Sequence, residues 1–393
     1  MSFDPFGRSD DLARLASDGY ELELTDGGFL LVKHVPYRTE VGAVDYGTII
    51  SPIELNGDIT VNPVNDHSTW FSGTPPFTSS NEQIIGVIDT NPQEVASGLT
   101  AGCRLSCKRG DGAQYVDYYE KIATYHRILG GPARALDPGA TAITHGPCLV
   151  DNTDWPFEYV DTASGRAGIG AISGKLAGSK IAIVGLGGTG SYILDLVAKC
   201  PVAEIHLFDG DVFSTHNAFR APGAPDLDML RAGKTKVSYL SEIYARMKRN
   251  IIVHPYPLNA ANAAELGGMS FVFLAMEGGQ IKRELVDALE AAQLPFVDAS
   301  LGVVKTENDD RLLANLQVNG STADNRQTLR DNLDFGNLND DDPYEANIQI
   351  ADLNAMNAAL AVMWWKRYSG VYHHRTLRHH ERLNVNFGRL VIK

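Results

Sequence analysis

Residues 181–200, IAIVGLGGTGSYILDLVAKC, constrain the fold of this chain more than any other stretch. An apolar run predicts a buried strand, and the glycine-rich turn after it leads directly into a helical pattern. Gly185, Gly187 and Gly190 have the GxGxxG spacing, and Gly188 adds a fourth glycine. Such a strand–turn–helix unit wraps backbone N–H groups around a phosphate. The phosphate could belong to a nicotinamide or flavin dinucleotide or to ATP, and the glycines fit both.

The chain from residue 180 onward alternates between strand and helix patterns. Strands are expected at 180–184, 204–208, 251–257, 270–275 and 295–299, and helices at 190–199, 234–249 and 280–293. This alternation predicts a doubly wound, Rossmann-like α/β domain with a mainly parallel sheet.

The first 150 residues have a different texture, which predicts a β-rich domain. Two hairpin patterns lie at 20–33 and at 48–61 around Asn56-Gly57. One helix interrupts the β-rich region at 117–129, and we expect it to end at Gly130, Gly131 and Pro132. A stretch rich in Gly, Pro and Thr at 135–148 then predicts a boundary. We therefore expect an accessory or protein-binding domain at 1–150 and a nucleotide-binding domain at 151–393.

A polar segment and a long helix follow the α/β region. Residues 319–344 lack any apolar pattern, and a loop of this length is usually functional or disordered. The helix expected at 345–368 has an apolar stripe of Ile348, Leu353, Met356, Leu360 and Trp364, typical of a core or dimer contact. The tail after it predicts a last strand.

Composition excludes several classes of protein. The net charge of −14 argues against a general nucleic-acid binder. Neither an 18-residue apolar run nor a basic-then-apolar N-terminal pattern is present, so we expect no membrane span and no secretion. Four cysteines in 393 residues are too few for a disulfide scaffold, which suits a reducing cytoplasm.

The residues beyond the glycine turn favour ATP over a dinucleotide. Asp209 follows Gly190 by nineteen positions, at the end of the second expected strand, where a carboxylate can accept hydrogen bonds from a ribose. Asn217, Arg220 and Lys236 come next and could cradle a triphosphate. Adenylyl transfer expels pyrophosphate, so positive charge must face the departing group.

The ordered set GLGGTG, DGD, N-x-x-R and G-x-x-K resembles the ThiF/MoeB/ubiquitin-activating-enzyme-like adenylyltransferase superfamily over roughly residues 165–305. The resemblance implies a homodimeric or pseudodimeric enzyme. Such an enzyme uses ATP and magnesium to adenylate the C-terminal carboxylate of a ubiquitin-like or sulfur-carrier protein. By position, Asp209 resembles the ribose ligand with Asp211 as its acidic neighbour, and Asn217, Arg220 and Lys236 resemble the phosphate-contacting set.

The chain also departs from the family pattern. The family usually has an aspartate after the fourth strand that serves the metal, whereas the nearest acid here is Glu277, one methylene longer. Arg166 is the candidate for the arginine that reaches into the partner subunit's site in this family. The zinc-binding cysteine pairs of many relatives are missing.

No cysteine follows Cys200, although many activating enzymes pass the adenylate to their own thiol. Cys200 ends the expected first helix on the side away from the glycine loop, so we interpret it as structural. Either the enzyme stops at the acyl-adenylate and a partner's nucleophile takes over, or a hydroxyl replaces the thiol. Ser321 or Thr322 in the polar loop would then form an oxyester.

A β-rich front domain joined to a ThiF-like domain resembles proteins of bacterial ubiquitination-like operons. This resemblance implies a ubiquitin-like carrier and a conjugating-enzyme-like protein as partners. Three alternatives stay open: a sulfur-carrier adenylyltransferase for cofactor biosynthesis, an NAD-dependent oxidoreductase and a non-catalytic scaffold. Glu277 and the absent thiol motivate the scaffold.

Overall fold

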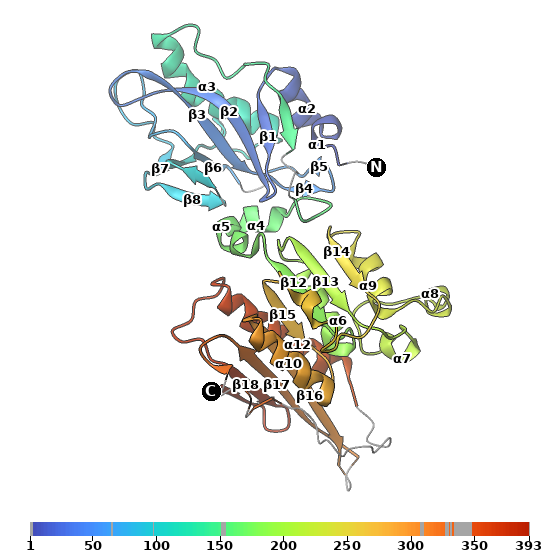
Figure 1. The fold of residues 1–393 in the computed structure, drawn as a ribbon. Helices are drawn as coiled ribbons and strands as arrows, with labels where there is room; N and C mark the ends of the chain where they lie inside the picture. The colour runs from blue at the N-terminus through green and yellow to red at the C-terminus, as the bar shows by residue number, and fades with distance from the viewer. Residues whose placement is uncertain are drawn as a thin grey trace. The chain divides into compact units, whose positions relative to one another are not determined.

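The computed structural model of the protein describes residues 3–63, 66–96, 98–150, 155–306, 310–326, 330, 332–333 and 348–392. The chain forms two compact units, Met1–Gly174 (unit 1) and Lys175–Lys393 (unit 2), coloured blue to green and green to red in Figure 1. The division falls later than the expected change near residue 150. Residues after 155 pack on unit 1, where a Cβ built on Gly165 would lie 2.4 Å from the carbonyl oxygen of Gly27.

Unit 1 is built on a mostly antiparallel sheet with the strand order β11-β1-β2-β3-β6-β10-β7, in which β11 pairs with β1 in parallel. Both predicted hairpins are confirmed, as β1–β2 and as β4–β5 around Asn56-Gly57. The strands are β1 Leu22–Leu24, β2 Phe29–Arg38, β3 Val44–Pro52, β4 Leu55–Asn56, β5 Ile59–Thr60, β6 Ser68–Phe71, β7 Val87–Asp89, β8 Gln93–Ala96, β9 Leu99–Ala101, β10 Cys103–Ser106 and β11 Cys148–Val150. The helices are α1 Pro5–Arg8, α2 Asp10–Ser17, α3 Tyr118–Leu136, α4 Thr162–Ala167 and α5 Gly170–Ser173.

Helix α3 continues beyond the expected stop. The prediction that it ends at Gly130, Gly131 and Pro132 is wrong, because the helix passes through Pro132 and ends at Leu136. A proline inside a helix removes one backbone hydrogen bond. Packing against β2 offsets this loss, since Gly130 lets the helix lie close to Pro36, 3.5 Å from the position of a Cβ.

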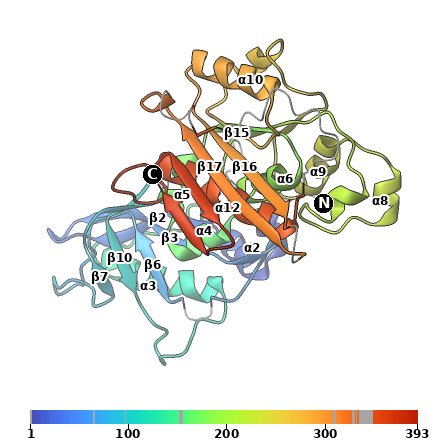
Figure 2. The same ribbon diagram turned by 90° about the horizontal axis from the view of Figure 1, so that it is seen from below.

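Unit 2 contains the predicted α/β sheet, with the strand order β14-β13-β12-β15-β16-β17-β18-β19. The strands from β14 to β16 are parallel, and those from β16 to β19 pair antiparallel. Their bounds are β12 Lys180–Val184, β13 Glu204–Phe208, β14 Ile251–His254, β15 Phe271–Leu274, β16 Phe296–Lys305, β17 Leu312–Ser321, β18 His380–Asn384 and β19 Arg389–Ile392. Figure 2 shows β16 and β17 as long neighbouring strands.

The expected polar loop at 319–344 begins instead as the end of β17, because residues 319–321 pair with β16. Residues 327–329, 331 and 334–344 of that loop lie outside the described residues.

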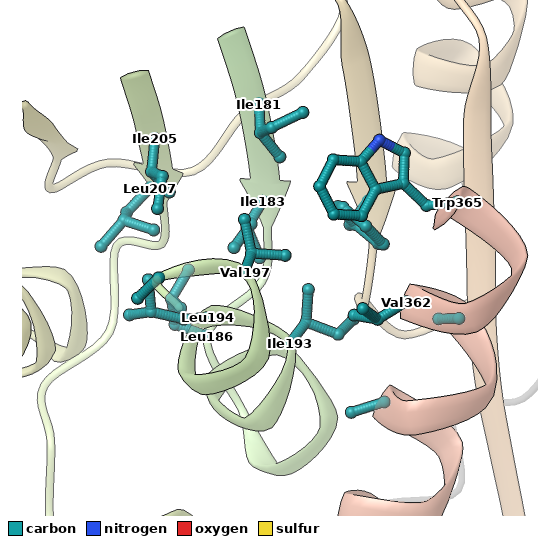
Figure 3. Close-up of a cluster of buried hydrophobic side chains, with 14 of the residues drawn as sticks. Ile181, Ile183, Leu186, Ile193, Leu194, Val197, Ile205, Leu207, Val362 and Trp365 are labelled. Carbon is teal, nitrogen blue, oxygen red and sulfur yellow. The ribbon is translucent and has the colours of Figure 1, made fainter. Parts of the chain in front are cut away.

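Helices cover both faces of this sheet. Helices α6 and α12 pack on one face, with Ile193, Val197, Val362 and Trp365 meeting the β12 side chains in Figure 3. Helix α10 contributes Leu285 to the cluster on the other face. The helices of unit 2 are η1 Gly174–Leu176 (whose first residue closes unit 1), α6 Gly188–Val197, α7 Thr215–Ala218, α8 Leu227–Arg231, α9 Lys236–Tyr244, η2 Ala263–Leu266, α10 Gln280–Ala291 and α12 Ala351–Tyr368. In the described part of the chain, none of the helices has the length and apolar character needed to cross a bilayer.

The buried face of α12 differs from the expected stripe. Met356 is 48% exposed, whereas Asn354, Asn357, Ala358 and Ala361 are fully buried. Small and amide side chains let this helix lie close to α6 and β16. Leu360 and Trp364 of the expected stripe are buried, as predicted, at 5% and 0% exposure. The two buried asparagines were missed because an apolar pattern does not select amide side chains.

Candidate nucleotide-binding site

The glycine loop after β12 requires its glycines. Gly185 has a φ of +86°, which favours glycine, and its N–H donates to Phe208 O at 2.9 Å. A Cβ on Gly190 would lie 1.8 Å from Gly185 O. The loop therefore turns sharply into α6, and the first N–H groups of that helix have no intrahelical partners. A turn of this kind can bind a phosphate, and phosphate binding by this loop stays a prediction.

Asp209 lies directly after β13 and is 9% exposed. Its Oδ2 accepts the N–H of Leu186 at 2.7 Å and its Oδ1 accepts that of Asp211 at 2.8 Å. Lys236 Nζ lies 3.4 Å from Oδ2. A carboxylate has about four acceptor positions, so one is left for a ribose hydroxyl.

Lys236 begins α9 and is 6% exposed. Its Nζ lies 2.6 Å from Oδ2 of Asp211, whose side chain is 75% exposed. The structure thus brings Lys236 to the two carboxylates expected on the ribose side, rather than leaving it free for a phosphate. A phosphate oxygen would compete with the exposed Asp211 for this ammonium.

Asn217 and Arg220 present buried donors. Asn217 closes the capping box of α7, accepts the N–H of Ser214 at 2.9 Å through Oδ1, and is 2% exposed. Within the described part of the chain, Asn217 Nδ2 and Arg220 Nε are buried and have no hydrogen-bond partner. Buried donors are nearly always paired, so this arrangement fits an anionic ligand such as a phosphate.

Asn354 of α12 connects the two halves of the site, and sequence reasoning missed it. Its Oδ1 accepts the hydroxyl of Thr189 at 3.1 Å, and its Nδ2 donates to Arg220 O at 3.3 Å. A Cβ on Gly188 would lie 1.9 Å from Asn354 Nδ2. Gly188 is therefore a glycine because a buried amide occupies that space. The sequence signal that could have identified Asn354 is an asparagine within the apolar pattern of the expected helix.

A cavity of about 660 Å³ is lined in part by the glycine loop. Its lining residues are Gly187–Thr189, Ala275–Gly278, Lys282, Ala299–Lys305, Ile348 and Gln349. Glu277 is exposed at its edge, just after β15. In the described ranges, no group of three or more His, Cys, Asp or Glu could hold a metal ion. Nucleotide-bound Mg²⁺ uses one or two carboxylates plus phosphates, so Glu277 fits as a protein ligand.

Three further polar residues meet beside this cavity, which Lys282 and Ser300 line, and all three were absent from the sequence predictions. Lys282 and Asp298 are buried to about 1% exposure or less, with Nζ 2.6 Å from Oδ1. Ser300 Oγ donates to Asp298 Oδ2 at 2.8 Å and lies 3.4 Å from Lys282 Nζ. They come from α10 and β16, so no local sequence pattern joins them.

The structure does not bring the predicted hydroxyl nucleophiles to the cavity. Ser321 is fully buried and pairs with Phe296, the first residue of β16, whereas the cavity is lined by the last residues of that strand. Thr322 caps a turn through Asn325 Oδ1 at 3.2 Å. Both therefore lie toward the opposite end of the sheet from the glycine loop. Cys200 is buried, as predicted.

Arg166 belongs to α4 in unit 1. Its Nη1 donates to Glu54 Oε1 at 3.2 Å, and its side chain is 74% exposed. A role for Arg166 in a partner subunit's site stays a prediction.

A Rossmann-like sheet, a glycine loop after β12 and buried donors beyond β13 together have the arrangement of a nucleotide-binding domain. Residues 167–315 match the model of the ThiF family. Residues 10–162 match a domain of unknown function, DUF6791. A comparison with curated proteins gave no match.

Solved structures with a similar fold include PaaA, Escherichia coli MccB with ATP, and E. coli tRNA N6-threonylcarbamoyladenosine dehydratase, TcdA. PaaA is 18% identical with a TM-score of 0.45, over 56% of this chain and 65% of PaaA. MccB is 16% identical with a TM-score of 0.40, over 56% and 65%. TcdA is 18% identical with a TM-score of 0.36, over 51% and 90%. The chain thus spans less than two thirds of the PaaA and MccB chains.

Proposed function

We propose that this protein is an ATP-dependent adenylyltransferase that activates the C-terminal carboxylate of a ubiquitin-like protein for transfer to a conjugating-enzyme-like partner. The observation that carries the proposal is the pair of buried, unpartnered donors, Asn217 Nδ2 and Arg220 Nε, next to a phosphate-binding glycine loop. A dinucleotide, whose pyrophosphate is held at the helix N-terminus, has no use for them.

Each residue of the site has a role in this reaction. The substrate carboxylate attacks the α-phosphorus, an O–P bond forms, and the bond to the β-phosphate breaks to release pyrophosphate. Asp209 holds the ribose, and the first N–H groups of α6 hold the phosphates. Asn217 and Arg220 stabilise the negative charge on the departing pyrophosphate. Magnesium, held partly by Glu277, would neutralise phosphate charge.

The shape of the cavity supports a peptide tail as the second substrate. Its wall includes the last seven residues of β16, Ala299–Lys305, and it meets the glycine loop at Gly187 and Gly188. A narrow, extended segment that ends in a carboxylate fits such a wall, with small residues beside the loop. A ubiquitin-like protein with a glycine-rich terminus has this chemistry. We propose in addition that the protein forms a homodimer.

ATP–pyrophosphate exchange tests the proposal. The probe is a synthetic peptide that ends in Gly-Gly, used at millimolar concentration, and its C-terminal amide is the matched control. Exchange is expected with the free acid only. Arg220→Ala should lower the exchange rate by about 100-fold, the usual cost of losing a transition-state donor. Arg231→Ala, which removes an exposed arginine of α8, should leave it unchanged.

The outcomes separate the alternatives. A sulfur-carrier adenylyltransferase would show the same exchange, and a co-purifying sulfurtransferase in place of a conjugating enzyme would identify it. Absence of exchange with a folded protein would favour the scaffold. Saturable binding of NADH, seen by its fluorescence, would favour the oxidoreductase.

A further inference from the structure

Three side chains form hydrogen bonds with Ser300 at the wall of the cavity. Its Oγ donates to Asp298 Oδ2 at 2.8 Å and lies 3.4 Å from Lys282 Nζ. Its backbone oxygen accepts Asn357 Nδ2 from α12 at 3.1 Å. Asp298 and Asn357 are fully buried, and Lys282 is 1% exposed, while Ser300 itself is half-buried. A surface serine on a strand has no need of such support.

The direction of these hydrogen bonds indicates what Ser300 offers to a ligand. A hydroxyl has one proton and two lone pairs. The proton points to Asp298, and one lone pair faces Lys282. The second lone pair is left for the cavity. Ser300 therefore presents electron density, which suits attack on a carbonyl carbon and does not suit binding of a carboxylate.

We propose that Ser300 is an acyl acceptor, which takes the substrate's terminal acyl group from the adenylate as an ester. This step rests on the proposed adenylation. Ser300 Oγ forms a bond to the acyl carbon, the bond from that carbon to the phosphate oxygen breaks, and AMP leaves. The hydroxyl proton passes to the Asp298 carboxylate, and Lys282 balances the charge of that carboxylate.

The energetics favour this reaction at an acyl-adenylate. A serine needs a neighbouring base because its own proton is tightly held, and Asp298 is placed as that base. An acyl-phosphate anhydride is already activated, so a carboxylate base is sufficient where an unactivated amide would require more. Serine thus supplies the function for which related enzymes use a thiol.

The thiol and the two hydroxyls considered from the sequence are less suited. Cys200, the one cysteine of residues 175–393, is 3% exposed in the core beneath α6. Ser321 and Thr322 lie toward the opposite end of β16 from the cavity lining.

Intact-protein mass spectrometry tests the inference, with the full chain, ATP, magnesium and the Gly-Gly peptide. We expect the wild type to gain the peptide mass less one water, and fragmentation should place it on Ser300. The adduct should resist a thiol reductant and be cleaved by hydroxylamine. Ser300→Ala should lose it, and Ser300→Cys should carry a thioester. Thr322→Ala is the matched control and should keep the wild-type adduct. Circular dichroism verifies that each variant is folded.

Each result decides a different point. Exchange without any adduct in the wild type refutes the acceptor role and leaves the proposed adenylation intact. An adduct that persists in folded Ser300→Ala refutes it as well. Absence of exchange refutes the proposed function and this inference with it. If Ser300→Ala misfolds, the mapped adduct on the wild type and the thioester on Ser300→Cys still decide.

Discussion

The contact between Gly188 and Asn354 gives the sharpest prediction, because one substitution should rescue another. Alanine at Gly188 places a Cβ 1.9 Å from Asn354 Nδ2. The amide is fully buried and bonded to both Thr189 and Arg220, so it cannot move aside without losing these bonds. Asn354→Ala removes the obstacle and the two hydrogen bonds together.

The magnitudes follow from those two bonds. Leaving a buried donor or acceptor without its partner costs about 1–3 kcal/mol per group. Gly188→Ala and Asn354→Ala should therefore each destabilise unit 2 by roughly 2–4 kcal/mol. In the double variant the new methyl group occupies the vacated space, and the cost should equal that of Asn354→Ala alone. The coupling free energy is then roughly 2–4 kcal/mol in favour of the double variant.

Urea unfolding with hydrogen–deuterium exchange of α6 and α12 peptides measures this coupling for unit 2 by itself. Gly190→Ala is the matched control, because its Cβ would lie 1.8 Å from the backbone oxygen of Gly185 and not from a side chain. Asn354→Ala should fail to rescue it. Additive costs for Gly188→Ala and Asn354→Ala would show that the amide does not occupy the space assigned to it.

Three further predictions concern charge, pH and the division of the chain. Lys236→Ala should weaken ATP binding by about tenfold or more in calorimetry, because Asp209 loses a charged partner worth roughly 1.5–3 kcal/mol. Burial lowers the pKa of Lys248 from 10.5 to about 7, so the unfolded chain binds more protons between these values and the stability of unit 2 should rise with pH. The slope of the unfolding free energy against pH should stay below about 1.4 kcal/mol per pH unit, the limit for one proton. A slope that persists in Lys248→Met would show that Lys248 does not cause it. Gly165→Ala should destabilise unit 1, since the new Cβ would meet the Gly27 carbonyl oxygen. Hydrogen–deuterium exchange of unit 1 peptides that stays at the wild-type level would disprove this packing.

The sequence predicts the glycine-loop half of the site well. Strands 180–184 and 204–208 agree with β12 and β13 residue by residue, because a continuous apolar run that stops at glycine or aspartate is typical of a buried parallel strand. The same pattern places Asp209 at the carboxyl end of its strand. The spacing of Asn217 and Arg220 also locates them beyond that strand, although burial of their unpaired donors is visible only in the structure.

Residues that act through tertiary contacts are beyond the reach of a local pattern. Asn354 is separated from Thr189 by 165 positions, and Lys282 from Ser300 by 18. A buried polar side chain interrupts an apolar stripe without indicating its partner. Ser321 illustrates the opposite error, since a polar surrounding sequence indicated a loop where cross-strand pairing with Phe296 creates a strand.

The uneven lengths of β15 and β16 have a consequence for the protein in concentrated solution. Pairing between these strands ends at Leu274 and Asp298, whereas β16 continues to Lys305 with β17 on its other side. Among the described strands, none pairs with Ala299–Lys305 on the side away from β17, so the backbone groups there form an open edge, except Ser300 O, which accepts Asn357 Nδ2. An open edge is a template for self-association. A bound peptide that pairs with this edge should therefore raise the concentration at which the protein remains monodisperse.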